Sequence, residues 1–411
     1  MSPLARPFRT RAFGLLGALT AVVASWTVAA PAAQADDMRS RQWYLDAMKA
    51  DELWKVSTGK GITVGVLDTG VDSTVSELHG VKVLPGRNFY GEGPGRVDNK
   101  DTDRHGTNMA ITIAGNGANG GIKGLAPNVT ILPVKTGSAV DVGGATAATE
   151  GIRYAVDNGA RIINMSFGGY RQEDAEIARW QEAVDYALKK GALLFAASGN
   201  DGLDTDSYPA SAPGVVAVGA LDSKGKVTKF SNYGDYVALA APGDDMPGRC
   251  SSDKNTYCET FGTSQATAVA SASAALIWSA HPDWTANQVL RVMMETAGHN
   301  GPVPSKYIGY GSIRPAQVLL EGKGDPGPPD VNPLLAARSS RSPAPQTSPS
   351  PESTGAGDNG QSSQESPSKA PEAAAGSNGG GLPLWAIVAS AAAGVVIIGV
   401  VVAVSVRSRR A

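Results

Sequence analysis

Polar and apolar positions divide the central part of the chain into two kinds of segment. Short, mostly apolar runs, which predict strands buried on both faces, occur at residues 62–67, 129–134, 162–165 and 192–197. Residues 146–158 and 173–190 carry apolar side chains at helical spacing, and a glycine follows each segment. Strands that alternate with helices predict a three-layer α/β fold, in which helices cover both faces of a mostly parallel central sheet.

The carboxyl ends of parallel strands are where ligands bind in such folds. Asp68 directly follows the first predicted strand, and Ser198-Gly199-Asn200 follows the strand at 192–197. A functional site is therefore expected at this edge of the sheet.

The N-terminus has the pattern of a secretion signal. Arginines precede an apolar run over residues 12–30, and the small-residue triplet Ala33-Gln34-Ala35 follows it. This pattern predicts a signal peptide over residues 1–35, with an uncleaved membrane anchor as the alternative. A signal peptide implies that the folded region is extracytoplasmic.

The C-terminus has the pattern of a membrane anchor. Residues 384–406 contain no charge and are long enough to cross a bilayer, and the basic tail 407–411 follows. Because positive flanks stay inside the cell, this predicts a single-pass cell-membrane protein with a cytoplasmic C-terminus. A buried globular helix is the alternative. Residues 323–383, rich in Pro, Ser and Gly, predict a disordered linker, and residues 36–322 remain for one domain with a short N-terminal extension.

Charge and cysteine content limit the kinds of ligand that the chain is expected to bind. Lys+Arg of 36 against Asp+Glu of 38 gives a formal charge of -2, so no basic field points to nucleic acid. The chain has two cysteines, Cys250 and Cys258, which cannot form a four-ligand zinc site. In an extracytoplasmic domain they predict a disulfide, with metal binding as the weaker alternative. The segment 115–124 has no carboxylate, so no tight calcium site is expected there. We expect no other metal site and no cofactor.

Two motifs carry polar side chains suited to acid–base chemistry. Asp68-Thr69-Gly70 follows a strand, and His105-Gly106-Thr107 opens a predicted helix. An Asp-Thr-Gly triplet also marks aspartic proteases, but these need two such carboxylates and the sequence has no second triplet. An imidazole supplies a base near neutral pH. Taken singly, a turn-capping aspartate and a structural histidine are the alternatives.

A third motif places a hydroxyl at the start of a helix. Gly262-Thr263-Ser264 leads into the small-residue run 268–278, so Ser264 is expected at a helix N-terminus, where negative charge is stabilised. Taken alone, an N-cap serine is the alternative.

The order of these motifs resembles that of the subtilisin-like serine proteases. The resemblance implies that Asp68, His105 and Ser264 form a catalytic triad and that Asn200 supplies the oxyanion-hole amide. It also implies two walls for the side chain before the cut, made by Ser166, Phe167 and Gly168 and by Ala197, Ser198 and Gly199. These walls carry no charge, so we expect a small or apolar side chain there.

Some positions differ from the usual pattern of that family. Asn108 and Ile111 replace the commoner His and Gly after the histidine, and Ala268 replaces a proline after the nucleophile. The extension between Asp36 and Lys60 is also too short for a folding prodomain. None of these differences removes a catalytic group.

The whole arrangement of segments is similar to that of the mycosins, membrane-anchored subtilisin-like proteases of type VII secretion systems. The resemblance implies a serine endopeptidase that acts on protein or peptide substrates, is held in the lipid bilayer and associates with type VII secretion components. The alternative is a mainly structural component that stabilises a secretion complex, with proteolysis secondary.

Overall fold

The computed structural model describes most of the chain between its ends, namely residues 38–98, 104–137, 144–170, 173–253 and 255–340. The strands are β1 (Thr63–Asp68), β2 (Arg87–Asn88), β3 (Thr130–Lys135), β4 (Ile162–Met165), β5 (Leu193–Ala197), β6 (Val216–Leu221), β7 (Val237–Pro242), β8 (Met246–Arg249) and β9 (Tyr257–Thr260). The α-helices are α1 (Trp43–Ala47), α2 (Ala50–Leu53), α3 (His105–Ala114), α4 (Gly144–Asp157), α5 (Asp174–Lys189), α6 (Thr263–Ala280), α7 (Ala286–Glu295), α8 (Pro315–Leu319) and α9 (Pro333–Ser339).

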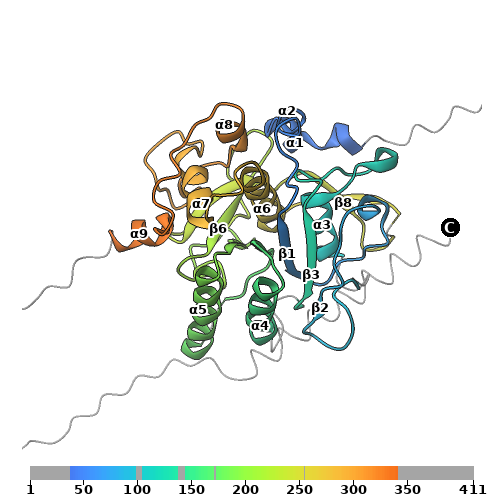
Figure 1. Ribbon diagram of the computed structural model, residues 1–411, viewed down its shortest axis with the longest axis horizontal. Coiled ribbons are helices and arrows are strands. Elements are labelled where there is room, and N and C mark those ends of the chain that lie inside the picture. The colour runs from blue at the N-terminus through green and yellow to red at the C-terminus, as the bar shows by residue number, and fades with distance from the viewer. Residues whose placement is uncertain (1–37, 99–103, 138–143, 171–172, 254, 341–411) are drawn as a thin grey trace, which may run out of the picture. The chain divides into compact units, whose positions relative to one another are not determined.

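Seven strands form one sheet in the order β2-β3-β1-β4-β5-β6-β7 (Figure 1). Every neighbouring pair in this sheet is parallel, which confirms the predicted α/β class. The strand predicted at 162–165 coincides with β4, and the other predicted strands and helices lie within two residues of observed ones. Strands β8 and β9 form a separate antiparallel hairpin that the sequence did not predict.

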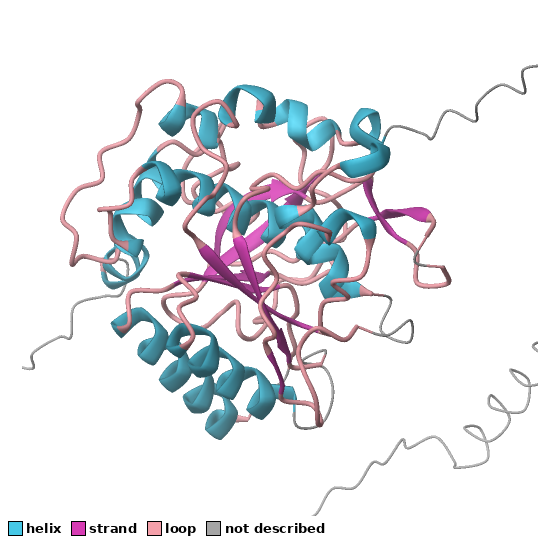
Figure 2. Ribbon diagram, turned by 45° about the vertical axis from the view of Figure 1, so that its right-hand side comes forward, coloured by secondary structure: helices cyan, strands magenta, loops and turns pink. Residues whose placement is uncertain are grey.

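The sheet has a hydrophobic core on each face. Val66 packs in the core that α3, α6 and α7 cover, and its neighbour Leu67 packs in the core that α4 and α5 cover. Successive side chains of a strand point to opposite faces, so adjacent residues serve different cores. Figures 1 and 2 show α4 and α5 together on one side of the strands, with the remaining large helices across from them.

The N-terminal extension is part of the folded domain. Tyr44, Leu45 and Leu53 in α1 and α2 are fully buried in the core that also contains α6. The Ser57 hydroxyl donates a hydrogen bond to the carbonyl of Leu276 in α6 at 2.7 Å. The extension therefore contributes to the core of the domain.

The folded domain continues beyond residue 322, where the sequence predicted the linker to begin. We call residues 323–340 the C-terminal strap, because they run along α7 and end in α9, which buries Leu334. Three side chains of α7 and its N-cap donate hydrogen bonds to main-chain carbonyls of the strap. These bonds are Thr285 Oγ1 to Pro329 (2.8 Å), Gln288 Nε2 to Gly327 (3.0 Å) and Arg291 Nη2 to Val331 (3.1 Å). The predicted start of the linker is thus too early, and the packed region extends through Ser340.

Several predicted segments fall outside the described residues. These are the signal peptide 1–35, linker residues 341–383, the membrane helix 384–406 and the tail 407–411. In the part of the chain that the structure covers, no helix combines the length and the apolar character needed to cross a bilayer.

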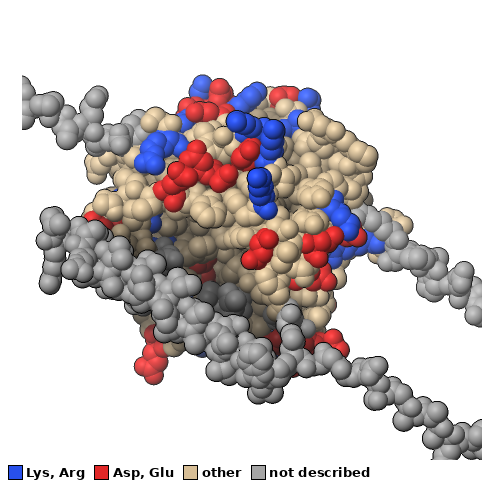
Figure 3. Space-filling view, turned by 180° about the vertical axis from the view of Figure 1, so that it is seen from behind, with Lys and Arg blue, Asp and Glu red and all other residues tan. Residues whose placement is uncertain are grey.

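Charged side chains of both signs are interspersed on the face shown in Figure 3. This fits the near balance of 36 Lys+Arg and 38 Asp+Glu over the whole sequence. The face therefore presents a mixed electrostatic surface rather than a field of one sign.

Candidate active site

The predicted acid and base meet at the carboxyl edge of the sheet. Asp68 is the last residue of β1, and His105 is the first residue of α3. The imidazole Nδ1 lies 2.8 Å from Asp68 Oδ1 and 3.0 Å from Oδ2. The Asp68 side chain is only 2% exposed, whereas that of His105 is 35% exposed. The carboxylate therefore holds one nitrogen of a ring that remains partly open to solvent.

Gly106 allows this close approach. A Cβ on residue 106 would lie 2.9 Å from the Cβ of Asp68 and 2.1 Å from the carbonyl oxygen of Gly70. Any larger residue would push α3 away from β1, so the glycine after the histidine is needed for packing.

A second buried carboxylate, Asp98, supports the start of α3. The Thr107 N–H and hydroxyl both donate to Asp98 Oδ2, at 2.9 and 2.6 Å. Thr69 donates its hydroxyl to Asp98 Oδ1 at 3.0 Å and accepts from the Gly106 N–H at 3.0 Å. Sequence reasoning missed Asp98, because a single aspartate in a glycine-rich loop has no periodicity that would single it out.

Ser264 is the second residue of α6 and is 8% exposed. Its hydroxyl donates to the Ser166 carbonyl at 2.8 Å, and the Ser166 hydroxyl donates to the Ser264 carbonyl at 3.0 Å. This reciprocal pair ties the N-terminus of α6 to the end of β4, which is the strand next to β1. The structure thus places the predicted nucleophile at the same sheet edge as the Asp68–His105 pair.

Asn200 is oriented by the residue before the predicted nucleophile. Its Oδ1 accepts from the Thr263 N–H at 2.8 Å and from the Thr263 hydroxyl at 2.9 Å. Because a main-chain N–H can only donate, these bonds fix which end of the carboxamide is oxygen. The Nδ2 end lies 3.2 Å from the position that a Cβ on Gly262 would take. The amide donor is thus held beside the start of α6.

The two predicted pocket walls face each other. Ser166, Phe167 and Gly168 follow β4, and Ala197, Ser198 and Gly199 lie at the end of the neighbouring strand β5. A Cβ on Gly168 would lie 3.7 Å from the Ala197 carbonyl oxygen and 2.3 Å from Ser207 Oγ. Ser207 is 1% exposed, and its hydroxyl has no hydrogen-bond partner among the residues that the structure describes. The sequence did not identify Ser207.

Tyr170 places a polar group beside the predicted wall at Gly199. Its hydroxyl donates to Asp201 and accepts from Asn232 Nδ2 at 2.6 Å, close to Gly199. Burial, followed by the Asp201 carboxylate, raises the pKa of Tyr170 to about 12. The phenol is therefore neutral at pH 7. The uncharged walls that we expected thus end beside one carboxylate.

A hollow of about 510 Å³ adjoins the loop before Ser264. Phe230 and Phe261 line it with their ring centroids 5.4 Å apart, and Lys229 and Asp244 contribute charged side chains. Phe261 is 65% exposed, which is unusual for so large an apolar side chain. The lining residues come from the loops that follow β6 and β7 and from the loop before α6.

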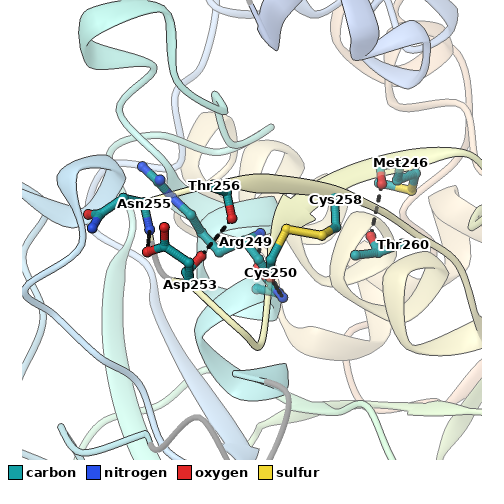
Figure 4. Close-up of a disulfide and its surroundings, with 9 residues drawn as sticks. Met246, Arg249, Cys250, Asp253, Asn255, Thr256, Cys258 and Thr260 are labelled. Carbon is teal, nitrogen blue, oxygen red and sulfur yellow. Dashed lines mark hydrogen bonds between the residues drawn. A yellow bond between two sulfur atoms is a disulfide. The ribbon is translucent and has the colours of Figure 1, made fainter. Parts of the chain in front are cut away.

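The two cysteines form the predicted disulfide. Cys250 and Cys258 join the strands of the β8–β9 hairpin with a Cα–Cα distance of 5.2 Å (Figure 4). The hairpin is also held by a hydrogen bond from the Thr260 hydroxyl to the Met246 carbonyl at 2.9 Å. Since β9 ends four residues before Ser264, the hairpin leads directly into the site.

A buried ion pair anchors the hairpin. Arg249 Nη2 lies 2.7 Å from Glu77 Oε1, and the two side chains are 6% and 0% exposed. The Tyr257 hydroxyl also donates to Glu77 Oε1, at 2.5 Å. Burial alone would raise the pKa of Glu77, but the hydrogen bonds from Tyr257 and Arg249 outweigh it and hold that pKa below its ordinary value. Sequence reasoning gave no sign of this pair.

Within residues 38–340, apart from the internal gaps, no group of three or more His, Cys, Asp or Glu side chains is arranged to hold a metal ion.

Comparison with known proteins decides the family. The subtilase family matches residues 59–311, which is more than half of the chain. The chain belongs to the subtilase family. This subtilase is 36% identical over 259 residues to subtilisin DY of Bacillus licheniformis, covering 62% of this chain and 89% of that protein. It is 38% identical over 244 residues to the major intracellular serine protease of Bacillus subtilis (strain 168), covering 57% and 74%.

Among solved structures, the chain is similar to MycP1 proteases. MycP1 from Mycobacterium smegmatis superposes with a TM-score of 0.61 at 28% identity, covering 70% of this chain and 86% of that one. A serine protease MycP1, described as an essential component of the type VII (ESX-1) secretion system, gives a TM-score of 0.60 at 31% identity, covering 70% and 90%. These likenesses confirm the resemblance to mycosin-type proteases, and the subtilase is a hydrolase of the subtilisin-like serine protease class.

Proposed function

We propose that this subtilase is a membrane-anchored, extracytoplasmic serine endopeptidase associated with type VII protein secretion. The observation that carries the enzymatic part is the hydrogen-bonded Asp68–His105 pair at the same sheet edge as Ser264 and Asn200. The arrangement matches the roles that acyl transfer requires, namely a nucleophile, a base, a group that orients the base and an oxyanion donor.

The first half of the reaction forms an acyl-enzyme. The Ser264 hydroxyl turns from the Ser166 carbonyl toward the imidazole, gives its proton to His105 and attacks the peptide carbonyl. Asp68 fixes the tautomer of the ring through Nδ1 and stabilises the imidazolium that forms. The imidazolium then gives the proton to the leaving amine, and the C–N bond breaks.

The second half repeats these steps with water. His105 takes a proton from a water molecule that attacks the acyl carbonyl, and the proton returns to Ser264 as the ester bond breaks. The enzyme ends in its starting state, so no cofactor is consumed.

The oxyanion of each tetrahedral intermediate would be held by Asn200 Nδ2 and the Ser264 N–H. Thr263 orients the amide before substrate arrives, because both of its donors bind Asn200 Oδ1. Removing one such donor lowers turnover by about 10²–10³-fold, a range observed for a subtilisin, which is a relative of this chain.

Substrate would lie as an extended strand along the edges of residues 166–168 and 197–199. The side chain before the cut would enter between these walls, and the buried Ser207 hydroxyl packs directly against Gly168. We expect small or apolar side chains there. The leaving-group side of the substrate would cross Ser264 toward Phe261 and the hollow beyond β6 and β7.

Location and partner rest on other observations. The signal pattern at 1–35 and the uncharged run at 384–406 support export and anchoring. The similarity to MycP1 structures described as parts of type VII secretion systems supports association with such a system. A membrane-fraction assay tests the anchor: the full chain should sediment with membranes, and a chain ending at residue 383 should not.

The enzymatic proposal is tested by labelling with a fluorophosphonate, which phosphonylates an activated serine as fluoride leaves. We expect stoichiometric labelling of the full chain and its complete loss in Ser264→Ala. The matched control is Ser273→Ala in the same helix, whose buried hydroxyl only bonds the Val269 carbonyl and whose loss should leave labelling intact. Folded protein that does not label would contradict the proposal.

The structural alternative is separated by the same variant in cells. One similar protein, MycP1, is described as an essential component of its secretion system, which is compatible with either role. If Ser264→Ala abolishes cleavage while secretion continues, the domain serves mainly as a structural component. If secretion stops as well, proteolysis is required.

A further inference from the structure

Asn108, one of the positions that departs from the usual family pattern, forms a two-way contact with the hairpin. It lies in the first turn of α3, three residues after His105, and is 6% exposed. The Arg249 N–H donates to Asn108 Oδ1 at 2.7 Å, and Asn108 Nδ2 donates to the Arg249 carbonyl at 3.0 Å. The carboxamide therefore pairs with β8 as a peptide group of a neighbouring strand would.

Neighbouring residues adapt to this contact. A Cβ on Gly248 would lie 3.3 Å from the Asn108 carboxamide and 2.5 Å from the Thr260 side chain, so glycine permits the approach. Arg249 cannot shift easily either, because Glu77 holds its guanidinium and the next residue, Cys250, is in the disulfide. Asn108 thus connects α3 to a fixed point.

The same hairpin is tied to the helix that carries Ser264. Gln265 Nε2 donates to the Thr260 hydroxyl at 2.8 Å, and Gln265 Oε1 accepts from the Thr112 hydroxyl of α3 at 3.3 Å. The hairpin therefore contacts α3 through Asn108 and α6 through Gln265. These contacts form a closed frame that joins the His105 helix, the β8–β9 hairpin and the Ser264 helix.

We propose that Asn108 is a positioning residue for the reaction, setting the place of His105 relative to Ser264 by locking α3 onto the hairpin. The inference rests on the catalytic roles proposed for these two residues. Asparagine suits the task because it offers one donor and one acceptor, and the Arg249 peptide requires both. A displacement of about 1 Å at a reacting group can lower a rate by about 10²-fold, so a frame of this kind can control turnover.

The experiment compares Asn108→Ala with Gln42→Ala. Gln42 makes the same kind of contact elsewhere: its Nε2 donates to the Lys123 carbonyl at 2.7 Å, its Oε1 accepts from the Lys123 N–H at 3.0 Å, and it is fully buried. Both variants lose a two-way carboxamide contact, but only one is on the frame. We expect Asn108→Ala to lower kcat by about 10- to 100-fold with little change in KM, and Gln42→Ala to leave kcat unchanged.

A second variant keeps the test decisive if Asn108→Ala does not fold. Asn108→Asp keeps the acceptor for the Arg249 N–H but loses the donor to its carbonyl, and it places a carboxylate one helical turn from His105. We expect a smaller fall in kcat and an upward move of the midpoint of the acid limb of the pH–rate profile, because the added charge favours the imidazolium.

The outcomes distinguish a failure of the proposed protease function from a failure of the positioning role of Asn108. If the wild-type chain does not react with fluorophosphonate, the proposed function fails. If it reacts, but Asn108→Ala reacts at the wild-type rate or loses no more kcat than Gln42→Ala, the positioning role fails. A change in KM alone, or an unmoved pH profile in Asn108→Asp, would also overturn it.

Discussion

Two acid–base pairs in this molecule have similar hydrogen-bond distances but different surroundings. Asp68–His105 leaves 35% of the imidazole side chain exposed, and Ser264 lies at the same edge of the sheet. Glu77–Arg249 is closed on all sides, with Tyr257 and Ser76 adding hydrogen bonds to the buried charges. A buried carboxylate is thus no sign of catalysis by itself. A catalytic partner must also remain accessible, and the His105 side chain is 35% exposed whereas that of Arg249 is 6% exposed.

The largest effect on activity is expected from neutralising Asp68 in the partly exposed Asp68–His105 pair. Asp68→Asn keeps the size of the side chain but favours the wrong tautomer of His105, so kcat should fall by about 10⁴-fold while the thermal unfolding midpoint changes little. Peptide hydrolysis and thermal unfolding measured on one preparation check this. Asp157→Asn, which removes a surface partner of Lys190, is the control and should alter neither quantity. Activity retained within about tenfold would mean that Asp68 is not the orienting acid.

A change in the buried Glu77–Arg249 pair is expected to lower stability and to leave the activity of the folded protein intact. Glu77→Gln leaves the Arg249 guanidinium buried without its counter-charge, which should lower the free energy of unfolding by about 3–5 kcal/mol. Denaturant unfolding checks the size, with Asp157→Asn again as the surface control. Fluorophosphonate should still label the folded fraction. A loss no larger than in the control would show that the pair adds nothing to stability.

The pH dependence of stability also distinguishes Glu77→Gln from the wild-type chain. Because the pKa of Glu77 is held below its ordinary value of 4.5, the unfolded chain binds a proton there more readily than the folded one. The stability that this carboxylate contributes is therefore complete above about pH 4.5 and is lost as the pH falls toward its folded pKa. Between pH 5 and pH 3, wild-type stability should decline more steeply than that of Glu77→Gln. Parallel declines would contradict the assigned shift.

The smallest effect is expected from opening the disulfide. Replacing both Cys250 and Cys258 by serine should lower stability by about 2.5 kcal/mol, because the bond closes a short loop. The hairpin keeps its hydrogen bonds and the Glu77–Arg249 pair, so kcat should fall less than in Asn108→Ala. Thermal unfolding and kcat of the double variant measure both effects. A larger fall in kcat than in Asn108→Ala would assign the positioning role to the disulfide instead.

The sequence predicted what local patterns encode. Apolar runs located β1 and β3 to β5, and motif order led to Asp68, His105, Asn200 and Ser264, which the structure brings to one edge. Their roles stay predictions until they are measured. Asp98, Ser207 and Arg249 were missed because their significance lies in contacts between segments far apart in sequence. No spacing within one element reveals such contacts.

The C-terminal strap shows a different limit. Its Pro- and Gly-rich composition is typical of a linker, yet it packs on α7 because its carbonyls meet donors on Gln288 and Arg291. Main-chain acceptors are present in every residue, so composition cannot distinguish a segment that finds donors from one that does not. Beyond Ser340 the linker expectation is unaffected, since those residues lie outside the described part.

The strap has a mechanical consequence. Any pull on the chain after Ser340 first meets α9 and the Arg291–Val331 bond, and then the bond between Thr285 and Pro329 at the start of α7. Ser264 lies at the other end of α6, which is about 27 Å long. Several hydrogen bonds and the buried Leu334 would bear such a load before it reached the hydrolytic groups. With the membrane anchor proposed above, tension on the chain would therefore be borne away from the groups that cleave the bond.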